Sequence, residues 1–173
     1  MQVRIRIPGC VAPYFRPRIR AVFQAPLEAR TAILVRGFAP SRRVRIFPEG
    51  WSERTSRFAP EMLAARIAQL RELACQIDRP SISHALVVLC YDSASFLLPE
   101  ERDRLWRAFG VPIFEQYLDK WNEVLAAECV AHAGLHVKRG CEGLPLNATP
   151  CPCGDPALRL RSTRPRLLRA AVA

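Results

Sequence analysis

The sequence contains few lysines, and arginine supplies nearly all of its positive charge. Only Lys120 and Lys138 are lysines, although the chain of 173 residues carries a formal net charge of +10. A strongly basic chain ordinarily indicates a polyanionic partner such as nucleic acid, because clustered cations bind phosphates. The excess of arginine, alanine, leucine and proline is also typical of a GC-rich coding background. The charge therefore allows a nucleic-acid partner without requiring one.

Long apolar segments are also lacking. No apolar run approaches the roughly 20 residues that span a bilayer, and residues 1–8 alternate charged and β-branched residues instead of forming the apolar core of a signal peptide. We therefore expect a cytoplasmic protein with no membrane partner. Thiols stay reduced in that compartment, which favours metal binding or burial over disulfides. Apolar neighbours around Cys10, Cys75 and Cys90 predict that these three thiols are buried.

The order of apolar and polar segments predicts an α/β fold with a partly parallel sheet. Residues 85–91 form a continuous apolar run, typical of a strand that is buried on both faces. Residues 99–109 start with proline and acidic residues and end before Gly110, which predicts a helix, and residues 111–118 begin a further strand. Residues 85–118 are thus a predicted strand–helix–strand unit. Ligands of such sheets collect at the carboxyl ends of the strands.

The N-terminal third is predicted to be rich in β structure. Alternating residues predict an edge strand at 2–7. Two further strands are expected at 31–35 and 43–47, at a hairpin-like separation. The segment 48–57 reads as a polar loop.

A helix and two short strands complete the predicted elements. An amphipathic helix is expected over 61–77, with apolar residues at helical spacing. These residues are Leu63, Ile67, Leu70, Ala74 and Ile77. Short strands are expected at 123–129 and at 158–161.

These elements divide the chain into four segments of one compact domain. Residues 1–58 form a β-rich segment and residues 59–122 the α/β core. We expect residues 123–160 to form a C-terminal knuckle that binds zinc, for the reason given next, and residues 161–173 to form a basic tail.

The zinc prediction comes from a dense group of cysteines and histidines. Residues 129–153 hold four of the seven cysteines and two of the three histidines. Cys151 and Cys153, followed by Gly154, form the firmest pair, because a tight turn lets both thiolates face one ion. Cys129 is the natural third ligand. Spacing does not choose among the candidates for the fourth position, which are His132, His136 and Cys141.

Three interpretations of this group remain open from the residues alone. Four protein ligands would close the coordination shell of Zn²⁺ and give it a structural role, which is the interpretation we favour. A catalytic zinc with three ligands, assisted by Glu128 as a base, is an alternative. In the third interpretation Cys129 is simply buried and the histidines are ordinary surface residues.

Residues 59 to about 160 resemble the phenylacetate-CoA ligase family of adenylate-forming enzymes. The most specific part is Glu128-Cys129, followed by Gly-Leu-His136 and the distal Cys151-Pro-Cys153-Gly. The resemblance implies zinc ligands at Cys129, His136, Cys151 and Cys153, with His132 and Cys141 as bystanders. Members of the family activate a carboxylate with ATP and Mg²⁺ and then transfer the acyl group to CoA.

The sequence departs from the family where the chemistry would occur. It has no Ser/Thr/Gly-rich phosphate loop upstream of residue 59. The nucleotide motif of the family falls on residues 114–118, where Tyr-Gly is replaced by Phe114-Glu and the Mg²⁺-binding Glu by Leu118. Asp119 lies one residue away, and Phe114, Tyr117 and Asp119 are what remains of a nucleotide site. The ribose-binding aspartate and the small C-terminal domain are also missing.

We therefore expect a truncated and catalytically degenerate relative of the ligases, stabilised by zinc. Such a protein would bind a nucleotide or acyl ligand, or would act with a second ligase subunit or with another copy of itself as part of a split ligase. The alternative is a basic, zinc-containing module that binds nucleic acid.

Overall fold

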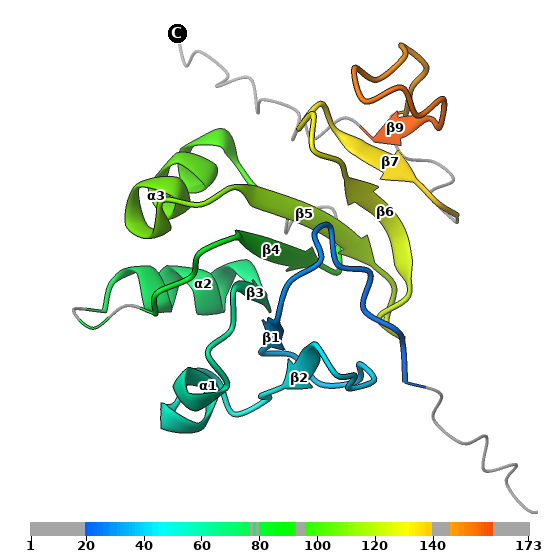
Figure 1. Cartoon of the computed structure of the whole chain (residues 1–173). Coiled ribbons are helices and arrows are strands. Elements are labelled where there is room, and N and C mark those ends of the chain that lie inside the picture. Colours follow the sequence, from blue (N-terminus) through cyan, green and yellow to red (C-terminus); the bar gives the residue numbers. More distant parts are fainter. Residues whose placement is uncertain (1–19, 77, 79, 93–95, 140–145, 161–173) are drawn as a thin grey trace, which may run out of the picture.

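The computed structural model describes residues 20–76, 78, 80–92, 96–139 and 146–160. Within these ranges a mixed sheet of nine strands extends through the molecule (Figure 1). The predicted strand at 2–7, the basic tail 161–173, Cys10 and Cys141 lie outside the described residues.

The sheet has a parallel half and an antiparallel half. The strand order across the sheet is β2-β1-β3-β4-β5-β6-β7-β9-β8. The first five strands in this order are parallel to one another, and the remaining pairs are antiparallel. The strands are β1 (Thr31–Ile33), β2 (Val44–Ile46), β3 (Met62–Ala65), β4 (Ala85–Cys90), β5 (Ile113–Leu118), β6 (Val124–Glu128), β7 (Leu135–Val137), β8 (Leu146–Asn147) and β9 (Arg159–Leu160). The α/β class with a partly parallel sheet is thereby confirmed.

The predicted strand–helix–strand unit is present as β4, α3 (Pro99–Phe109) and β5. All six residues of β4 are buried, because parallel partners β3 and β5 flank it and side chains cover both of its faces. Pro99 starts α3, and Gly110 ends it in the left-handed conformation with φ of 69°. Proline at the start and glycine at the end therefore predicted both ends of α3 correctly.

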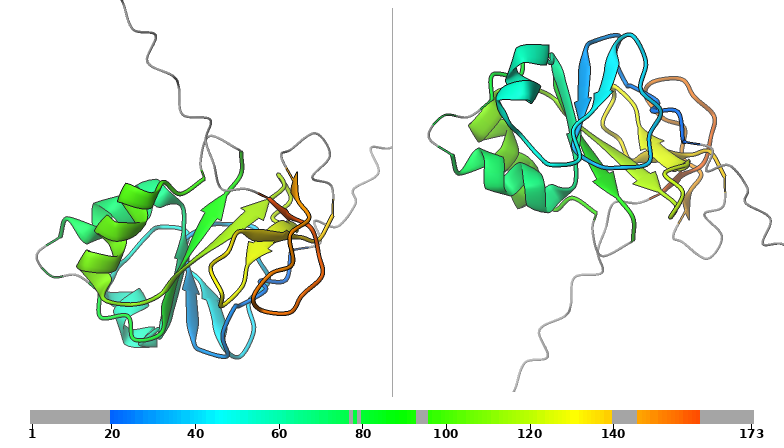
Figure 2. Two further views of the ribbon diagram at one scale, coloured as in Figure 1. Left: turned by 90° about the horizontal axis from the view of Figure 1, so that it is seen from above. Right: turned by 90° about the horizontal axis from the view of Figure 1, so that it is seen from below.

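Each face of the sheet is covered by a different layer. The helices α1 (Glu53–Phe58), α2 (Ile67–Ala74) and α3 pack on one face, where Leu70, Leu73 and Leu105 contact the strands. Figures 1 and 2 show α2 and α3 side by side on this face. Ala21 and Phe23, from the segment that precedes β1, cover the opposite face. Both faces of β1, β3, β4 and β5 are therefore largely buried, whereas the edge strand β2 is partly exposed.

The helix predicted over 61–77 is wrong in its first half. Residues 62–65 form β3, which pairs with β1 on one side and with β4 on the other, and only Ile67–Ala74 is helical. All four residues of β3 are buried. Backbone hydrogen bonds to two neighbouring strands and burial on both faces stabilise the strand more than the helical spacing of the side chains stabilises a helix.

The prediction of a hairpin in the N-terminal third is also wrong. Residues 31–33 and 44–46 are adjacent strands, but they run parallel, with Thr31 opposite Val44. The polar segment 48–57 contains most of α1 instead of being a loop throughout. Short parallel strands joined by about ten residues are hard to distinguish from a hairpin by residue pattern alone.

Toward the C-terminus, the strands predicted at 123–129 and 158–161 are present as β6 and β9, whereas β7 and β8 were not predicted. Of the thiols predicted to be buried, Cys90 is buried, but Cys75 follows the last turn of α2 and is exposed.

Candidate metal centre

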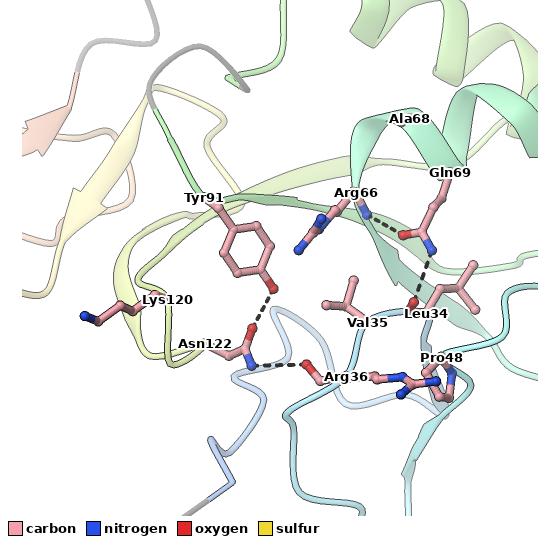
Figure 3. A pocket seen from close by; sticks show the side chains of 10 residues that line it. All are labelled: Leu34, Val35, Arg36, Pro48, Arg66, Ala68, Gln69, Tyr91, Lys120 and Asn122. Carbon is pink, nitrogen blue, oxygen red and sulfur yellow. Dashed lines mark hydrogen bonds between the residues drawn. The ribbon is translucent and has the colours of Figure 1, made fainter. Parts of the chain in front are cut away.

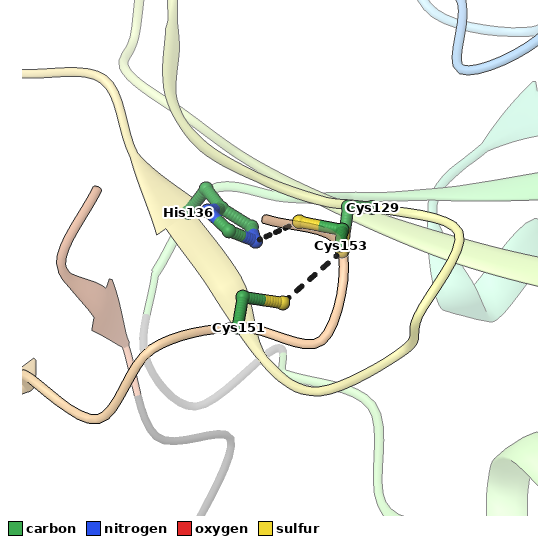
Figure 4. A group of neighbouring side chains, drawn as sticks. All are labelled: Cys129, His136, Cys151 and Cys153. Atoms are coloured by element: carbon green, nitrogen blue, oxygen red, sulfur yellow. Dashed lines mark hydrogen bonds between the residues drawn. The ribbon is translucent and has the colours of Figure 1, made fainter. Parts of the chain in front are cut away.

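The antiparallel half of the sheet brings four predicted ligands together. Cys129 directly follows β6, His136 lies in β7, and Cys151 and Cys153 lie in the loop that leads to β9. Because β7 pairs with both β6 and β9, these three segments meet at one place. One ligand atom from each of the four residues lies within 4.8 Å of the other three. Figure 4 shows the four side chains pointing toward one another, and we call this group the cysteine–histidine cluster.

The spacing of the ligand atoms suits a tetrahedral ion. The Sγ atoms of Cys129 and Cys151 are 3.6 Å apart, and Cys153 Sγ is 3.5 Å from His136 Nε2. Zinc–sulfur bonds of about 2.3 Å at the tetrahedral angle place two sulfurs about 3.8 Å apart. Three thiolates and an imidazole are a ligand set that zinc prefers, so the donors fit this metal in kind and in spacing.

Two glycines let the loops around the cluster turn tightly. Gly154 has φ of 84°, and its N–H donates to the carbonyl of Cys151 at 2.9 Å, which closes the knuckle between the two thiols. Gly134 has φ of 109°, and a Cβ at this position would lie 2.9 Å from the carbonyl oxygen of Leu160. Glycine is needed at both turns because L side chains rarely adopt these backbone angles.

A buried arginine connects the loops that carry the thiols. Arg159, in β9, is 5% exposed, and its guanidinium donates to the carbonyl oxygens of Ala133 and Thr149, the latter at 2.8 Å. Ala133 lies in the loop after Cys129, and Thr149 lies just before Cys151. Arg159 therefore fixes two ligand-bearing loops relative to each other, a role that the sequence analysis missed because an arginine in a basic chain carries no distinguishing signal.

The thiols of the cluster differ in acidity. The backbone N–H of Cys153, which points at the thiol of Cys151, lowers the pKa of Cys151 to about 6. Burial raises the pKa of Cys129 to about 11, and the neighbouring thiols add to this rise. One thiolate thus forms readily near neutral pH, whereas a second one beside it is disfavoured. A divalent cation would remove this repulsion, because thiols that coordinate a metal lose their protons.

A carboxylate lies behind the ring of His136, whose Nδ1 forms no hydrogen bond within the described residues. The ring is 2% exposed; while Nε2 faces the thiols, Nδ1 lies 3.4 Å from Asp155 Oδ2. A hydrogen bond from the N–H of Ala157 lowers the pKa of Asp155, which favours its charged form. Histidines that bind metals commonly donate their other ring N–H to such a carboxylate. Asp155 was not predicted from the sequence, although an acidic residue directly after Gly154 is a usable signal.

The other predicted candidates are not members of the cluster or lie outside the described residues. The Nδ1 atom of His132 lies 3.1 Å from Glu128 Oε1, and its ring packs 4.8 Å from the ring of Phe114. Glu128, the candidate base, also accepts a hydrogen bond from Arg102 at 3.0 Å, so both of its oxygens already have partners. Cys141 is not among the described residues.

The residues of the degenerate nucleotide motif are not brought together. Phe114 and Tyr117 are separated by an odd number of positions in β5 and pack in the cores on opposite faces of the sheet. Asp119 Oδ1 accepts hydrogen bonds from the N–H groups of Trp121 and Glu123, at 2.8 and 2.9 Å, and so closes the turn between β5 and β6. The structure therefore assigns these three residues to packing and turn formation.

None of the helices in the described ranges is long and apolar enough to cross a membrane. Comparison with known families found no family model that matches the chain, and comparison with curated proteins found no match either.

Proposed function

We propose that this protein is a zinc-stabilised α/β domain, related to the phenylacetate-CoA ligase family, that uses zinc for structure and does not carry out adenylation by itself. The observation that carries the proposal is the convergence of Cys129, His136, Cys151 and Cys153. Spacing left six candidate ligands, the family resemblance selects these four, and the fold brings the same four ligand atoms within 4.8 Å.

The composition of the cluster favours a structural ion over a catalytic one. Four protein ligands fill the tetrahedral shell of Zn²⁺, whereas a catalytic zinc keeps one position for water or substrate. Glu128, the candidate base predicted from the sequence, is 8% exposed and paired with Arg102 and His132. The zinc would supply a cross-link between β6, β7 and the loop before β9.

The place of the cluster in the sheet supports the same interpretation. Because β6 is antiparallel to β5, Cys129 lies at the edge where the parallel strands begin. Ligands of open α/β sheets bind at the other edge, where the parallel strands end. The proposed zinc is therefore separate from the edge where a substrate is expected.

Loss of adenylation is supported by the position of the Mg²⁺-binding Glu of the family. This position is Leu118, which is fully buried, and Asp119 beside it is engaged by two backbone N–H groups. Neither side chain is placed to hold a metal-bound triphosphate. A ligand-binding role, or a role beside a second ligase subunit or a second copy of the chain, is what remains of the family function.

Metal analysis of purified protein tests the proposal. We expect about one zinc per chain for the natural protein and for His132→Ala, and strongly reduced zinc for His136→Ala and Cys153→Ser. His132→Ala is the matched control, because it also removes an imidazole ring, at a position four residues before His136. Substoichiometric zinc in the natural protein, well below one per chain, would overturn the proposal even if the variants fail to fold.

A further inference from the structure

The parallel half of the sheet has a cleft at the carboxyl ends of its strands. Its volume is about 790 Å³, and it is bordered by residues that directly follow β1, β3 and β4 and by residues in the connections after β2 and β5. Small-molecule sites of roughly 300–1,000 Å³ are common at this edge of α/β sheets. The residues that line it are Leu34, Val35, Arg36, Pro48, Arg66, Ala68, Gln69, Tyr91, Lys120 and Asn122 (Figure 3), and we call it the cationic cleft.

The charged residues that line this cleft are all cations. Arg36, Arg66 and Lys120 come from three different connections, and the lining includes no carboxylate. Within the described part of the chain, Arg66 and Lys120 form no ion pair, and Arg36 pairs only with Glu49, at 3.1 Å and with both side chains exposed. Exposed pairs of this kind are weak and exchange readily. Lys120 Nζ lies 5.1 Å from the centre of the exposed Trp121 ring, so a ligand would have to draw the side chains of Lys120 and Arg36 away from exposed partners.

Hydrogen bonds fix the walls of the cleft. Tyr91 Oη donates to Asn122 Oδ1 at 2.6 Å, and Asn122 Nδ2 donates to the carbonyl of Arg36 at 3.1 Å. These bonds tie the ends of β4, β5 and β1 together (Figure 3). Gly37 makes this approach feasible, because a Cβ there would lie 2.2 Å from Asn122 Nδ2. The Arg66 guanidinium lies 4.7 Å from the centre of the Tyr91 ring, which orients it beside the cleft.

The start of α2 adds to the positive potential. Arg66 immediately precedes this helix of eight residues, and Ala68 and Gln69 of its first turn line the cleft. Gln69 also donates to the carbonyl of Leu34 at 3.1 Å, which anchors the turn to the end of β1. The N-terminus of a helix carries a partial positive charge, which here has the same sign as the three side chains.

The geometry points to a binding site in the cationic cleft for a small molecule that carries a phosphate group. Arginines form paired hydrogen bonds with phosphate oxygens, and a lysine supplies a further point charge. A nucleic acid would instead need cations spread along an extended groove, with exposed rings for its bases. The inference deepens the proposed ligand-binding role by naming the ligand class, and it involves residues separate from the cysteine–histidine cluster.

Inorganic pyrophosphate, added to the zinc-loaded, ¹⁵N-labelled full chain, is the probe. We expect amide shifts that saturate and that centre on residues 34–37, 66–69 and 120–122. Arg66→Gln and Lys120→Gln should each weaken the affinity about tenfold or more, the loss of one charged hydrogen bond. Arg107→Gln, which removes an exposed arginine of α3 outside the cleft, should change it less than about twofold.

Three results would overturn the inference. The first is the absence of amide shifts in the cleft up to about 10 mM pyrophosphate, and the second is an equal loss of affinity in all three variants. The third is that a single-stranded oligonucleotide binds more tightly than pyrophosphate and that Arg107→Gln weakens this binding as much as Arg66→Gln does. Zinc content measured on the same samples separates this failure from failure of the proposed zinc centre, because the variants leave the cluster untouched.

Discussion

Glu115 of β5 is a fully buried carboxyl group with few compensating partners. Its Oε1 accepts hydrogen bonds from the N–H of Leu97 at 2.7 Å and from the thiol of Cys90 at 3.3 Å. Its Oε2 has no hydrogen-bond partner and lies 3.9 Å from Arg102. Burial raises the pKa of Glu115 above its usual range, more than these contacts lower it. The folded protein therefore holds this proton to a higher pH than the unfolded chain does.

A dependence of stability on pH follows. A raised folded-state pKa means that the folded state binds more protons, so the contribution of Glu115 to the free energy of unfolding falls as pH rises from about 4.3 through the folded pKa. Glu115→Gln removes this loss. We expect the variant to gain stability relative to the natural protein as pH rises from about 4 to 7, measured by urea denaturation at each pH.

Any pH dependence of zinc binding is common to both proteins and cancels in this difference. Glu53→Gln, at an exposed carboxyl group of α1, is the control. An equal change with pH in the two variants would contradict the assignment to Glu115.

Asp155 is expected to tune the affinity of the cluster for zinc. Asp155→Asn keeps the acceptor for the N–H of Ala157 but removes the charge 3.4 Å from His136 Nδ1. Loss of such a carboxylate typically lowers metal affinity about 10- to 100-fold. Competition against a zinc chelator measures the change. Asp119→Asn is the matched control, because Asp119 also accepts backbone N–H groups in a turn but lies in the β5–β6 connection; equal affinities in both variants would argue against the role of Asp155.

At the scale of elements, the last three strands of the antiparallel half of the sheet are very short. β7 has three residues, and β8 and β9 have two each, whereas β4 and β5 have six. Strands this short form few ladder hydrogen bonds and bury little apolar area, so we expect the proposed metal cross-link to contribute strongly to their order.

We therefore expect Cys153→Ser to release the C-terminal third while the parallel strands persist. In hydrogen exchange, amides of β7 and β9 should lose protection and those of β3, β4 and β5 should keep it, because the latter lie in a core that is buried on both faces. Cys75→Ser, at an exposed thiol after α2, is the control. Unchanged protection in β7 and β9 would contradict the cross-linking role, and uniform loss across the sheet would contradict the independence of the parallel half.

Some elements could be predicted from the sequence, and others could not. The β4-α3-β5 unit was predictable because a six-residue buried run, a proline start and a glycine end are all local signals. β3 was not, because Met62–Ala65 has helix-compatible residues and becomes a strand only between β1 and β4. The parallel pairing of β1 and β2 is likewise a property of the assembled sheet, which no local pattern encodes.

At the scale of the whole molecule, the sheet separates two sites. The cysteine–histidine cluster lies where the parallel strands begin, and the cationic cleft lies where they end. A zinc that pins β6 and β7 to the loop before β9 would stabilise the antiparallel half, and β6 pairs with β5, the last parallel strand. The zinc would thus maintain the scaffold of the cleft without contacting its ligand.

The two sites also differ in predictability. The cluster was predictable because cysteine and histidine are rare and lie close together in the sequence. For the cleft, the sequence predicted only that a ligand would bind at the carboxyl ends of the strands, near Tyr91 and Asp119, and not which residues line the site. Arg36, Arg66 and Lys120 are spread over 85 positions, and only the order of the parallel strands brings them to one place.

X-ray absorption at the zinc edge of the purified full chain shows whether the four residues of the cysteine–histidine cluster all bind zinc. We expect a four-coordinate zinc with three sulfurs at about 2.3 Å and one nitrogen at about 2.0–2.1 Å. A shell in which oxygen or additional nitrogen replaces sulfur, or one with fewer than three sulfurs, would contradict the assignment of Cys129, His136, Cys151 and Cys153 as a closed structural site.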